Sequence, residues 1–216
     1  MVRCIAIDFD NTLAHMDDPG YSGLFAIFTS RGVSLEAVRE IYGKVTALVG
    51  FTICALIDAI QVAGLLKCDD TIAIEREFDY WLLGHLTCYD DSTSQVNAWL
   101  AHGIPVIIVT SGEESYQRKK IEISQIACTD IIVVPPTRKK SHVIRELFGK
   151  YGGPIIMIDD KASELDSVRE DELSESDVRT IWIKRFDGRH TNQHAQYPHK
   201  EVTTLADPII IALIDL

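Results

Sequence analysis

Four apolar runs constrain the fold of this 216-residue chain more than any other feature of its sequence. They begin at Cys4, Ile104, Asp130 and Pro154, and a fifth candidate begins at Val178. The runs are rich in Ile and Val and show no polar alternation, which is typical of parallel strands buried on both faces. Segments with apolar residues at helical spacing lie between them. We therefore predict an α/β fold with a doubly wound parallel sheet.

The stretch from about His15 to Cys88 has no segment with a strand pattern. Ser34 before LEAVREIYGKV predicts an N-capped helix, and FTICALIDAIQVAGLL and TIAIEREFDYWLLGHL predict two more. The nearly all-apolar FTICALIDAIQVAGLL should be buried on most sides, because it is shorter than a membrane span and contains Asp58. We expect residues 17–88 to form a helical domain inserted into an α/β domain of residues 1–16 and 89–216. LADPIIIALIDL at the C-terminus predicts a final strand or helix.

Charge and cysteine usage narrow the functional classes. The formal net charge of -11 argues against a nucleic-acid partner, because phosphate backbones need clustered Lys and Arg. The five cysteines are odd in number and form no CxxC pair, which favours reduced thiols in a cytoplasmic protein. MVRCIAIDFD lacks the layout of a signal peptide. We expect a small-molecule ligand, no membrane partner, and a monomer or homodimer.

The ends of three apolar runs carry polar side chains. These are Asp8, Asp10 and Asn11 after the first run, Thr110, Ser111 and Gly112 after the second, and Asp159 and Asp160 after the fourth. In an open parallel sheet, ligands bind at the carboxyl ends of the strands, so these groups should meet. Four clustered carboxylates repel each other unless a cation is bound, and oxygen ligands without His or Cys favour Mg²⁺. Such an ion would also neutralise a phosphate dianion.

The spacing of Asp8 and Asp10 allows them two different roles. Asp8 could attack phosphorus and form an aspartyl-phosphate. Asp10 could protonate the leaving oxygen and then deprotonate the hydrolytic water.

These motifs, in this order, resemble those of the haloacid dehalogenase (HAD) superfamily over residues 5–160. DFDNTL is similar to its first motif, DxDxT in the phosphatases, and VIIVTSG to its second, a Thr or Ser ending a strand. Lys140 resembles the third-motif lysine, and IIMIDD resembles the acidic fourth motif. Where the family often has GDxxxD, this chain has Asp159 at the glycine and Glu164 at the distal acid. The resemblance implies a HAD-like Rossmannoid sheet with a C1-type helical cap that closes over the active site and selects substrates.

The resemblance also implies residue roles. The catalytic residues would be Asp8, Asp10, Thr110 and Lys140. The substrate phosphate would bind Asn11, Thr110, Ser111, Gly112 and Lys140. Magnesium would bind Asp8, Asp159, Asp160 and Asp10, the last through its backbone carbonyl. Lys139, Lys119 and Lys120 are alternatives to Lys140, which we favour because Val143, Ile144 and Leu147 then fall on the buried face of the next helix.

We therefore predict a magnesium-dependent phosphomonoester hydrolase that acts on a small phosphorylated metabolite. Dehalogenation is disfavoured, because the family members that cleave carbon–halogen bonds lack the second Asp. A phosphotransferase or phosphomutase on the same scaffold and a catalytically silent phospholigand-binding module are the alternatives. The segment with His190, His194 and His199 should be a solvated loop rather than a metal site.

Overall fold

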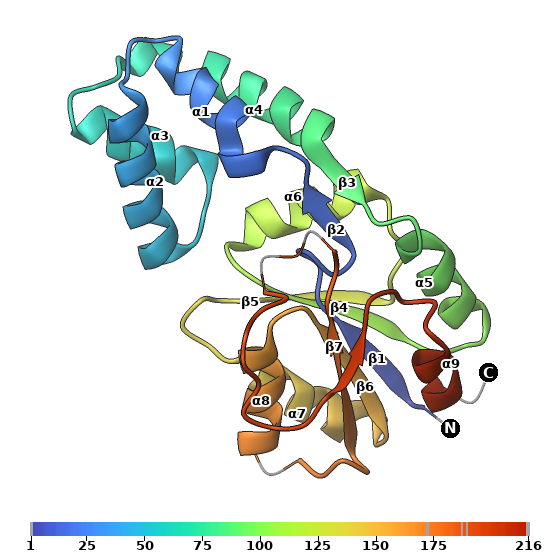
Figure 1. Ribbon diagram of the computed structural model, residues 1–216. Helices are drawn as coiled ribbons and strands as arrows, with labels where there is room; N and C mark the ends of the chain where they lie inside the picture. The colour runs from blue at the N-terminus through green and yellow to red at the C-terminus, as the bar shows by residue number, and fades with distance from the viewer. Residues whose placement is uncertain (1, 172, 187, 189, 215–216) are drawn as a thin grey trace.

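A six-stranded parallel sheet forms the centre of the protein (Figure 1). The structure is a computed structural model that describes residues 2–171, 173–186, 188 and 190–214. The strands are β1 (Cys4–Ile7), β4 (Val106–Ser111), β5 (Asp130–Val134), β6 (Ile155–Asp159), β7 (Val178–Ile183) and β8 (Lys200–Val202). Their order is β5-β4-β1-β6-β7-β8, so the strands β4, β1 and β6 are neighbours.

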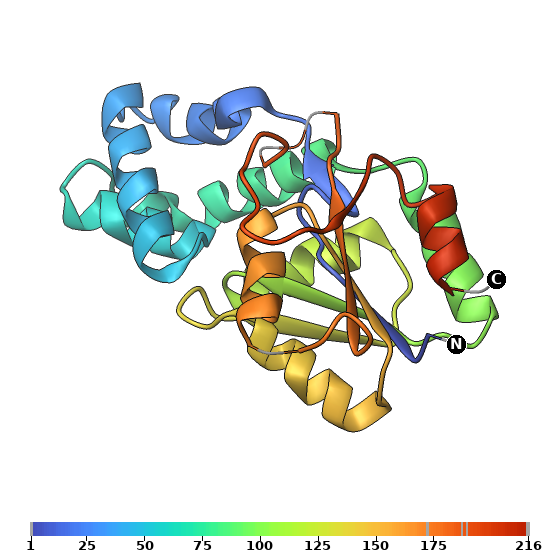
Figure 2. The ribbon, with the colours of Figure 1, turned by 60° about the horizontal axis from the view of Figure 1, so that its bottom comes forward.

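Helices cover both faces of the sheet (Figure 2). The helices α5 (Ser92–Ala101), α6 (Glu114–Ser124) and α9 (Pro208–Ile214) pack on one face, and α7 (Lys140–Tyr151) and α8 (Ala162–Glu170) on the other. Successive residues of a strand point to opposite faces, which explains the two-sided apolar runs. In β1, Ile5 and Ile7 pack with the first group, and Cys4 and Ala6 with the second. The predicted doubly wound α/β fold is confirmed.

The C-terminal part of the chain departs from the sequence-based expectations in two places. The strand β8 was not predicted, because its three residues are too few to show a pattern. The segment between β7 and β8 is not simply a solvated loop. His194 is exposed, but the side chain of His199 is fully buried between Asp166 (3.0 Å) and Thr180 (2.8 Å). The C-terminal tail forms the helix α9, and residues 215 and 216 lie outside the described residues.

Four helices make up the insert, which lies between β1 and α5 in the chain. They are α1 (Ser22–Thr29), α2 (Leu35–Val49), α3 (Ile53–Val62) and α4 (Thr71–His85), with short 3-10 turns η1 (Pro19–Tyr21) and η2 (Cys68–Asp70). The helix α2 begins where the sequence predicts, because the Ser34 hydroxyl accepts a hydrogen bond from the Ala37 N–H (3.2 Å). The helix α1 was not predicted as a separate element.

The insert has an apolar core of its own, in which the helices pack around Leu24, Phe28, Leu56, Ile74 and Phe78. The expectation that the segment from Phe51 is buried on most sides was wrong. The helix α3 buries one face through Leu56, Ile57 and Ile60, whereas Val62 is 90% exposed. Its apolar composition therefore overstated its burial.

Two short strands connect the insert to the sheet domain, so the expectation of no strand in this stretch was also wrong. The strand β2 (Ala14–Met16) pairs antiparallel with β3 (Leu86–Cys88) where the chain leaves and re-enters the sheet domain. Three-residue strands show no periodicity that a sequence pattern could reveal. Among the described residues, no helix has both the length and the apolarity that a membrane crossing would require.

Candidate active site

The polar residues at the ends of β1, β4 and β6 lie at one edge of the sheet. These strands are parallel neighbours, so their carboxyl ends point the same way. A cavity of about 160 Å³ at this edge is lined by Asp8, Asp10, Asn11, Thr110, Ser111, Lys140, Asp159, Asp160, Lys161, Glu164 and His190. The structure thus brings together every predicted site residue except Gly112 in the lining of one cavity.

A tight turn after β1 separates the two aspartates of the first motif. The Asp8 N–H still belongs to the sheet and donates to the Ile158 carbonyl (2.9 Å). The carbonyl of the buried Phe9 then accepts the N–H groups of Leu13 (2.9 Å) and Ala14 (3.1 Å). Asn11 takes a left-handed conformation (φ 56°) within this turn, which Asn tolerates better than most residues. Asp8 is consequently buried, whereas the Asp10 side chain is 36% exposed.

Lys140 is the lysine that reaches Asp8. It is the first residue of α7, and its Nζ lies 2.6 Å from Asp8 Oδ1 and 2.7 Å from Asp159 Oδ2. Its neighbour Lys139 points outward and pairs with Glu170 (2.8 Å). The geometry therefore agrees with the choice of Lys140 over Lys139.

Burial and mutual repulsion perturb the titration of this cluster. Burial raises the pKa of Asp8 to about 7, although the Lys140 ammonium acts in the opposite direction. Burial, followed by the charges of Asp8 and Asp159, raises the pKa of Asp160 to about 9. Burial disfavours the charged form of Lys140, but Asp159 and Asp8 outweigh that effect and raise the pKa of Lys140. One ammonium group therefore does not balance three buried carboxylates.

The carboxylates of Asp8, Asp159 and Asp160 fit a divalent cation. Each offers one oxygen, and the three oxygens lie within 4.8 Å of one another. The buried Asp160 Oδ2 has no hydrogen-bond partner among the described residues, as expected for an oxygen that needs a cation. An all-oxygen ligand set suits Mg²⁺. The carboxylate of Asp10 lies outside this group.

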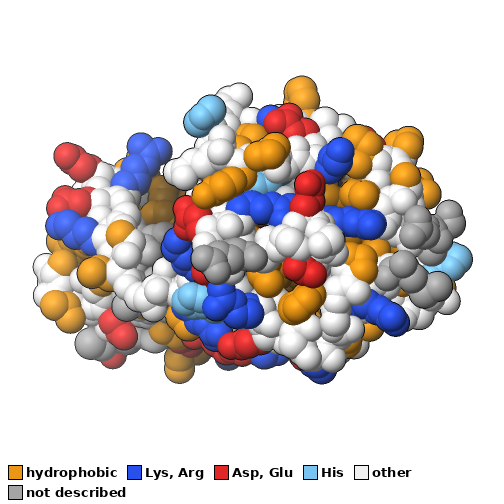
Figure 3. Space-filling model, turned by 90° about the horizontal axis from the view of Figure 1, so that it is seen from below, with side chains coloured by type: hydrophobic (Ala, Val, Ile, Leu, Met, Phe, Trp, Pro, Cys, Tyr) orange, Lys and Arg blue, Asp and Glu red, His pale blue; other side chains and the backbone are white. Residues whose placement is uncertain are grey.

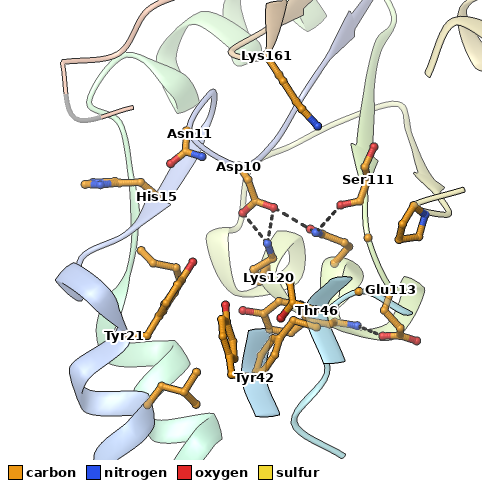
Figure 4. Close-up of a pocket in the computed structure, with 18 of the residues that line it drawn as sticks. Asp10, Asn11, His15, Tyr21, Tyr42, Thr46, Ser111, Glu113, Lys120 and Lys161 are labelled. Atoms are coloured by element: carbon orange, nitrogen blue, oxygen red, sulfur yellow. Dashed lines mark hydrogen bonds and ion pairs between the residues drawn. The ribbon is translucent and has the colours of Figure 1, made fainter. Parts of the chain in front are cut away.

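Asp10 contacts a different lysine, on a different helix. Nζ of Lys120, in α6, lies 2.5 Å from each carboxylate oxygen of Asp10 (Figure 4). Gln117, one turn earlier, donates from Nε2 to Asp10 Oδ2 (3.1 Å) and to the Ser111 carbonyl (2.9 Å). The two aspartates of the first motif are thus held by separate cations.

A second cavity, of about 420 Å³, adjoins the first and lies between the sheet domain and the insert. Both cavities share Asp10, Asn11, Ser111, Lys161, Glu164 and His190 in their linings. The insert contributes aromatic rings, including Tyr21 and Tyr42, which Figure 4 shows facing the cavity from below Asp10. Figure 3 shows the recess between the helical lobe on the left and the rest of the molecule.

Gly112 has a different surrounding from the one predicted. It lines only the larger cavity. Its N–H donates a hydrogen bond to the Val134 carbonyl (3.0 Å) at the end of β5 and is therefore not directed at the predicted phosphate site. A Cβ at this position would lie 2.6 Å from Gln117 Nε2. Glycine therefore leaves room for the Gln117 amide beside the site.

Sequence reasoning missed Gln117 and Lys161 and named Lys120 only as an alternative third-motif lysine. It assigned His190 to a solvated loop, whereas His190 lines both cavities. Gln117, Lys120 and Ile121 are all buried on one face of α6. Their spacing of three and four residues was the available signal, because a lysine on the buried face of an amphipathic helix needs a partner. Lys161 follows the acidic pair directly, and no pattern in the sequence marked it as a site residue.

Comparison with solved structures shows what this fold resembles. A haloacid dehalogenase-like hydrolase from Burkholderia xenovorans LB400 superposes with a TM-score of 0.71 at 17% identity, covering 99% of this chain and 98% of the other. A Thermotoga maritima protein assigned as a beta-phosphoglucomutase gives 0.66 at 10% identity and full coverage of both chains. A HAD family hydrolase from Deinococcus radiodurans R1, with bound phosphate and sodium, gives 0.54 at 14% identity and covers 99% and 96%.

Dehalogenases are also among the structures that share the fold. No protein-family model matches this sequence, and no curated protein matches it. At these low identities the likeness concerns the fold rather than the reaction. The chain has the fold of the haloacid dehalogenase-like hydrolases.

Proposed function

We propose that the protein is a magnesium-dependent phosphomonoester hydrolase that acts through an aspartyl-phosphate on Asp8. The proposal depends on the contact between Asp8 and Lys140 (2.6 Å). Asp10, two residues after Asp8, lines the same cavity. A nucleophilic carboxylate and a nearby second carboxyl group are what this two-step chemistry needs.

In the first step, an oxygen of Asp8 attacks phosphorus while the bond between phosphorus and the leaving oxygen breaks. The Lys140 ammonium, which contacts Asp8, stabilises negative charge on the transferring phosphoryl group. Asp10 gives its proton to the leaving oxygen, so the product departs as an alcohol. Thr110, which is buried at the end of β4, contributes its hydroxyl to the phosphoryl site.

In the second step, water attacks the phosphorus of the aspartyl-phosphate and the Asp8–phosphorus bond breaks. The Asp10 carboxylate takes the proton of that water, which restores the acid for the next cycle. When bound by Asp8, Asp159 and Asp160, Mg²⁺ would supply the positive charge that lets a phosphate dianion approach these carboxylates.

The insert would act as a cap and select the substrate. Its aromatic side chains line the larger cavity, which adjoins the Asp8 cavity through shared residues. The phosphoryl group would occupy the smaller cavity and the organic part of the substrate the larger one. A small phosphorylated metabolite fits this arrangement.

Phosphate release from p-nitrophenyl phosphate and from a panel of phosphomonoesters, with Mg²⁺ or with EDTA, tests the proposal. We expect release only with Mg²⁺ and a fall on the order of 10⁴-fold in Asp8→Asn. Asp17→Asn, a change at an exposed acid in the same segment, should keep wild-type activity. Acid-quenched wild-type protein should carry one phosphoryl group, and Asp8→Asn should carry none.

Other outcomes would contradict the proposal. Unchanged turnover in Asp8→Asn would remove the nucleophile from the mechanism. Transfer of the phosphoryl group to an added sugar phosphate, with little free phosphate, would make the protein a phosphotransferase. Halide release from a haloacid would make it a dehalogenase, and tight phosphoester binding without turnover would make it a binding module.

A further inference from the structure

Lys120 occupies an unusual position for a lysine on a surface helix. Only 4% of its side chain is exposed, and its ammonium group contacts both oxygens of Asp10 at 2.5 Å. The same group lies over the rings of Tyr116 (4.9 Å) and Phe9 (5.7 Å). Burying an ammonium group costs several kcal/mol unless good partners offset it. Placing this cation at Asp10 therefore has a desolvation cost, which the contacts with Asp10 offset.

The neighbouring cations of α6 behave differently. Arg118 pairs with Glu114 one turn away, and Lys119 pairs with Asp79 of the insert, in both cases among exposed side chains. Pairs of that kind contribute little to stability. Lys120 is thus distinguished from Lys119, the adjacent residue, by burial and by its partner.

Gln117 adds a second contact from the same helix face. Its side-chain amide donates to Asp10 (3.1 Å) and to the Ser111 carbonyl (2.9 Å), and so connects Asp10 to the end of β4. The absence of a side chain at Gly112 makes room for that amide. Lys120 and Gln117 together fix the direction of the Asp10 carboxyl group.

That direction matters because Asp10 lines both cavities. Under the proposed function, the bond that breaks joins the phosphoryl group in the smaller cavity to the organic part in the larger one. The leaving oxygen would then lie at the junction, next to Asp10. Lys140 from α7 contacts Asp8, and Lys120 from α6 contacts Asp10, so each aspartate has its own cation.

We propose that Lys120 is a positioning residue, which with Gln117 holds the Asp10 carboxyl group at the junction of the two cavities for proton transfer to the leaving oxygen. This inference rests on the proposed hydrolase function. Lys120 itself neither gains nor loses a proton in the reaction. As the Asp8–phosphorus bond forms, the electron pair of the breaking bond goes to the leaving oxygen, which takes its proton from Asp10.

The test depends on how much the leaving group needs that proton. p-Nitrophenolate is stable as an anion and leaves without a proton, whereas an alkoxide does not. The value of kcat/KM reports only the steps up to the first irreversible one, here the departure of the leaving group. Comparing kcat/KM for p-nitrophenyl phosphate and for an alkyl phosphate therefore isolates the contribution of Asp10.

We expect Lys120→Met to lower kcat/KM for the alkyl phosphate on the order of 10²-fold, and for p-nitrophenyl phosphate by less than about fivefold. Lys120→Arg should recover part of the loss. Lys119→Met, which removes the adjacent exposed lysine, should leave both values unchanged. Gln117→Met removes only the second contact and should shift the ratio of the two values in the same direction, by about threefold.

Equal losses for both substrates in Lys120→Met would indicate a general structural effect and overturn the inference. An unchanged ratio of kcat/KM for the two substrates would also overturn it. If Lys120→Met does not fold, the ratio measured for Gln117→Met tests the inference instead. Crystal structures of wild type and Lys120→Met provide a readout without turnover, because the Asp10 carboxylate should leave its position in the variant. If wild type releases no phosphate from any ester, the proposed function is wrong. If the Asp10 carboxylate keeps its position in Lys120→Met, the positioning role of Lys120 is wrong, whatever the activity.

Discussion

The sheet domain and the helical insert bury different kinds of side chain. Among the residues that the structure describes, the buried charged side chains of the sheet domain are Asp8, Lys120, Lys140, Asp159, Asp160, Asp166 and Arg185, whereas the insert buries only Asp18. The core of the insert consists of aliphatic and aromatic side chains such as Phe28, Leu56 and Phe78. Asp18 itself connects two helices, because it accepts from the Gly23 N–H and from Trp81 Nε1 (both 2.8 Å).

The two regions obtain their stability in different ways. Apolar burial stabilises the insert at no electrostatic cost, by roughly 25 cal/mol for each Å² removed from water. Buried charges at the sheet edge cost free energy that pairing only partly offsets. Such a cost is typical of functional sites. Substitutions at the sheet edge should therefore change turnover, and substitutions in the insert core should change the free energy of unfolding.

Lys140→Met should have the largest effect. It removes the cation that contacts Asp8 and Asp159, and turnover should fall on the order of 10³-fold. Lys139→Met is the matched control, because Lys139 is exposed and pairs with Glu170, and it should stay within about twofold of wild type. Steady-state kinetics on a phosphomonoester measure both. Equal losses of turnover in the two variants would contradict the different roles assigned to the buried Lys140 and the exposed Lys139.

Phe78→Ala tests the apolar side of the comparison. Phe78 is 1% exposed at the centre of the insert core, and its truncation should lower the free energy of unfolding by about 3–5 kcal/mol. Tyr80→Ala, at a side chain that is 76% exposed on the same helix, should change it by less than about 0.5 kcal/mol. Urea unfolding followed by circular dichroism measures both. A stable Phe78→Ala variant would show that the insert does not depend on its apolar core.

Asp91→Asn tests a charge of the sheet domain that lies away from the site, because the half-buried Asp91 carboxylate pairs with the buried Arg185. Asp91 accepts both Nη groups of Arg185 (2.8 Å each), and Arg185 also donates to the Thr12 carbonyl (2.8 Å). Burial acts to raise the pKa of Asp91, but hydrogen bonds from Arg185, Thr204 and the Leu205 N–H lower it below its ordinary value. We expect the substitution to cost about 1–3 kcal/mol of stability near pH 7 with little change in kcat.

The pH dependence of that cost follows from the sign of the shift. A depressed carboxyl pKa stabilises the folded state above the unfolded-state pKa of about 3.9, and the contribution disappears as the pH falls through the folded-state pKa. The stability difference between wild type and Asp91→Asn should therefore be largest above about pH 5 and shrink below pH 4. Thermal melts across this range measure it. A difference that grows on acidification would contradict the assigned role of Asp91.

Much of the sheet domain could be predicted from the sequence. Its strands are buried on both faces and therefore read as continuous apolar runs, and the groups after Ile7, Val109 and Ile158 had to meet once those strands were parallel neighbours. The predictions of secondary structure and burial were wrong where the local sequence has no informative hydrophobic pattern. The strands β2, β3 and β8 are too short for periodicity, and the apolar α3 buries one face only.

From the sequence alone it follows that Asp8, Thr110 and Asp159 lie at the same edge of the sheet, because parallel strands place their carboxyl ends at one edge whatever the helices between them do. The strand order, the choice among the candidate lysines and the contact of Lys120 with Asp10 follow from the tertiary structure. Lys140 reaches Asp8 across 132 positions of the chain, and Lys120 reaches Asp10 across 110. Those contacts depend on the angle and rotation at which α6 and α7 pack against the sheet, which are set by the whole core and by no local motif.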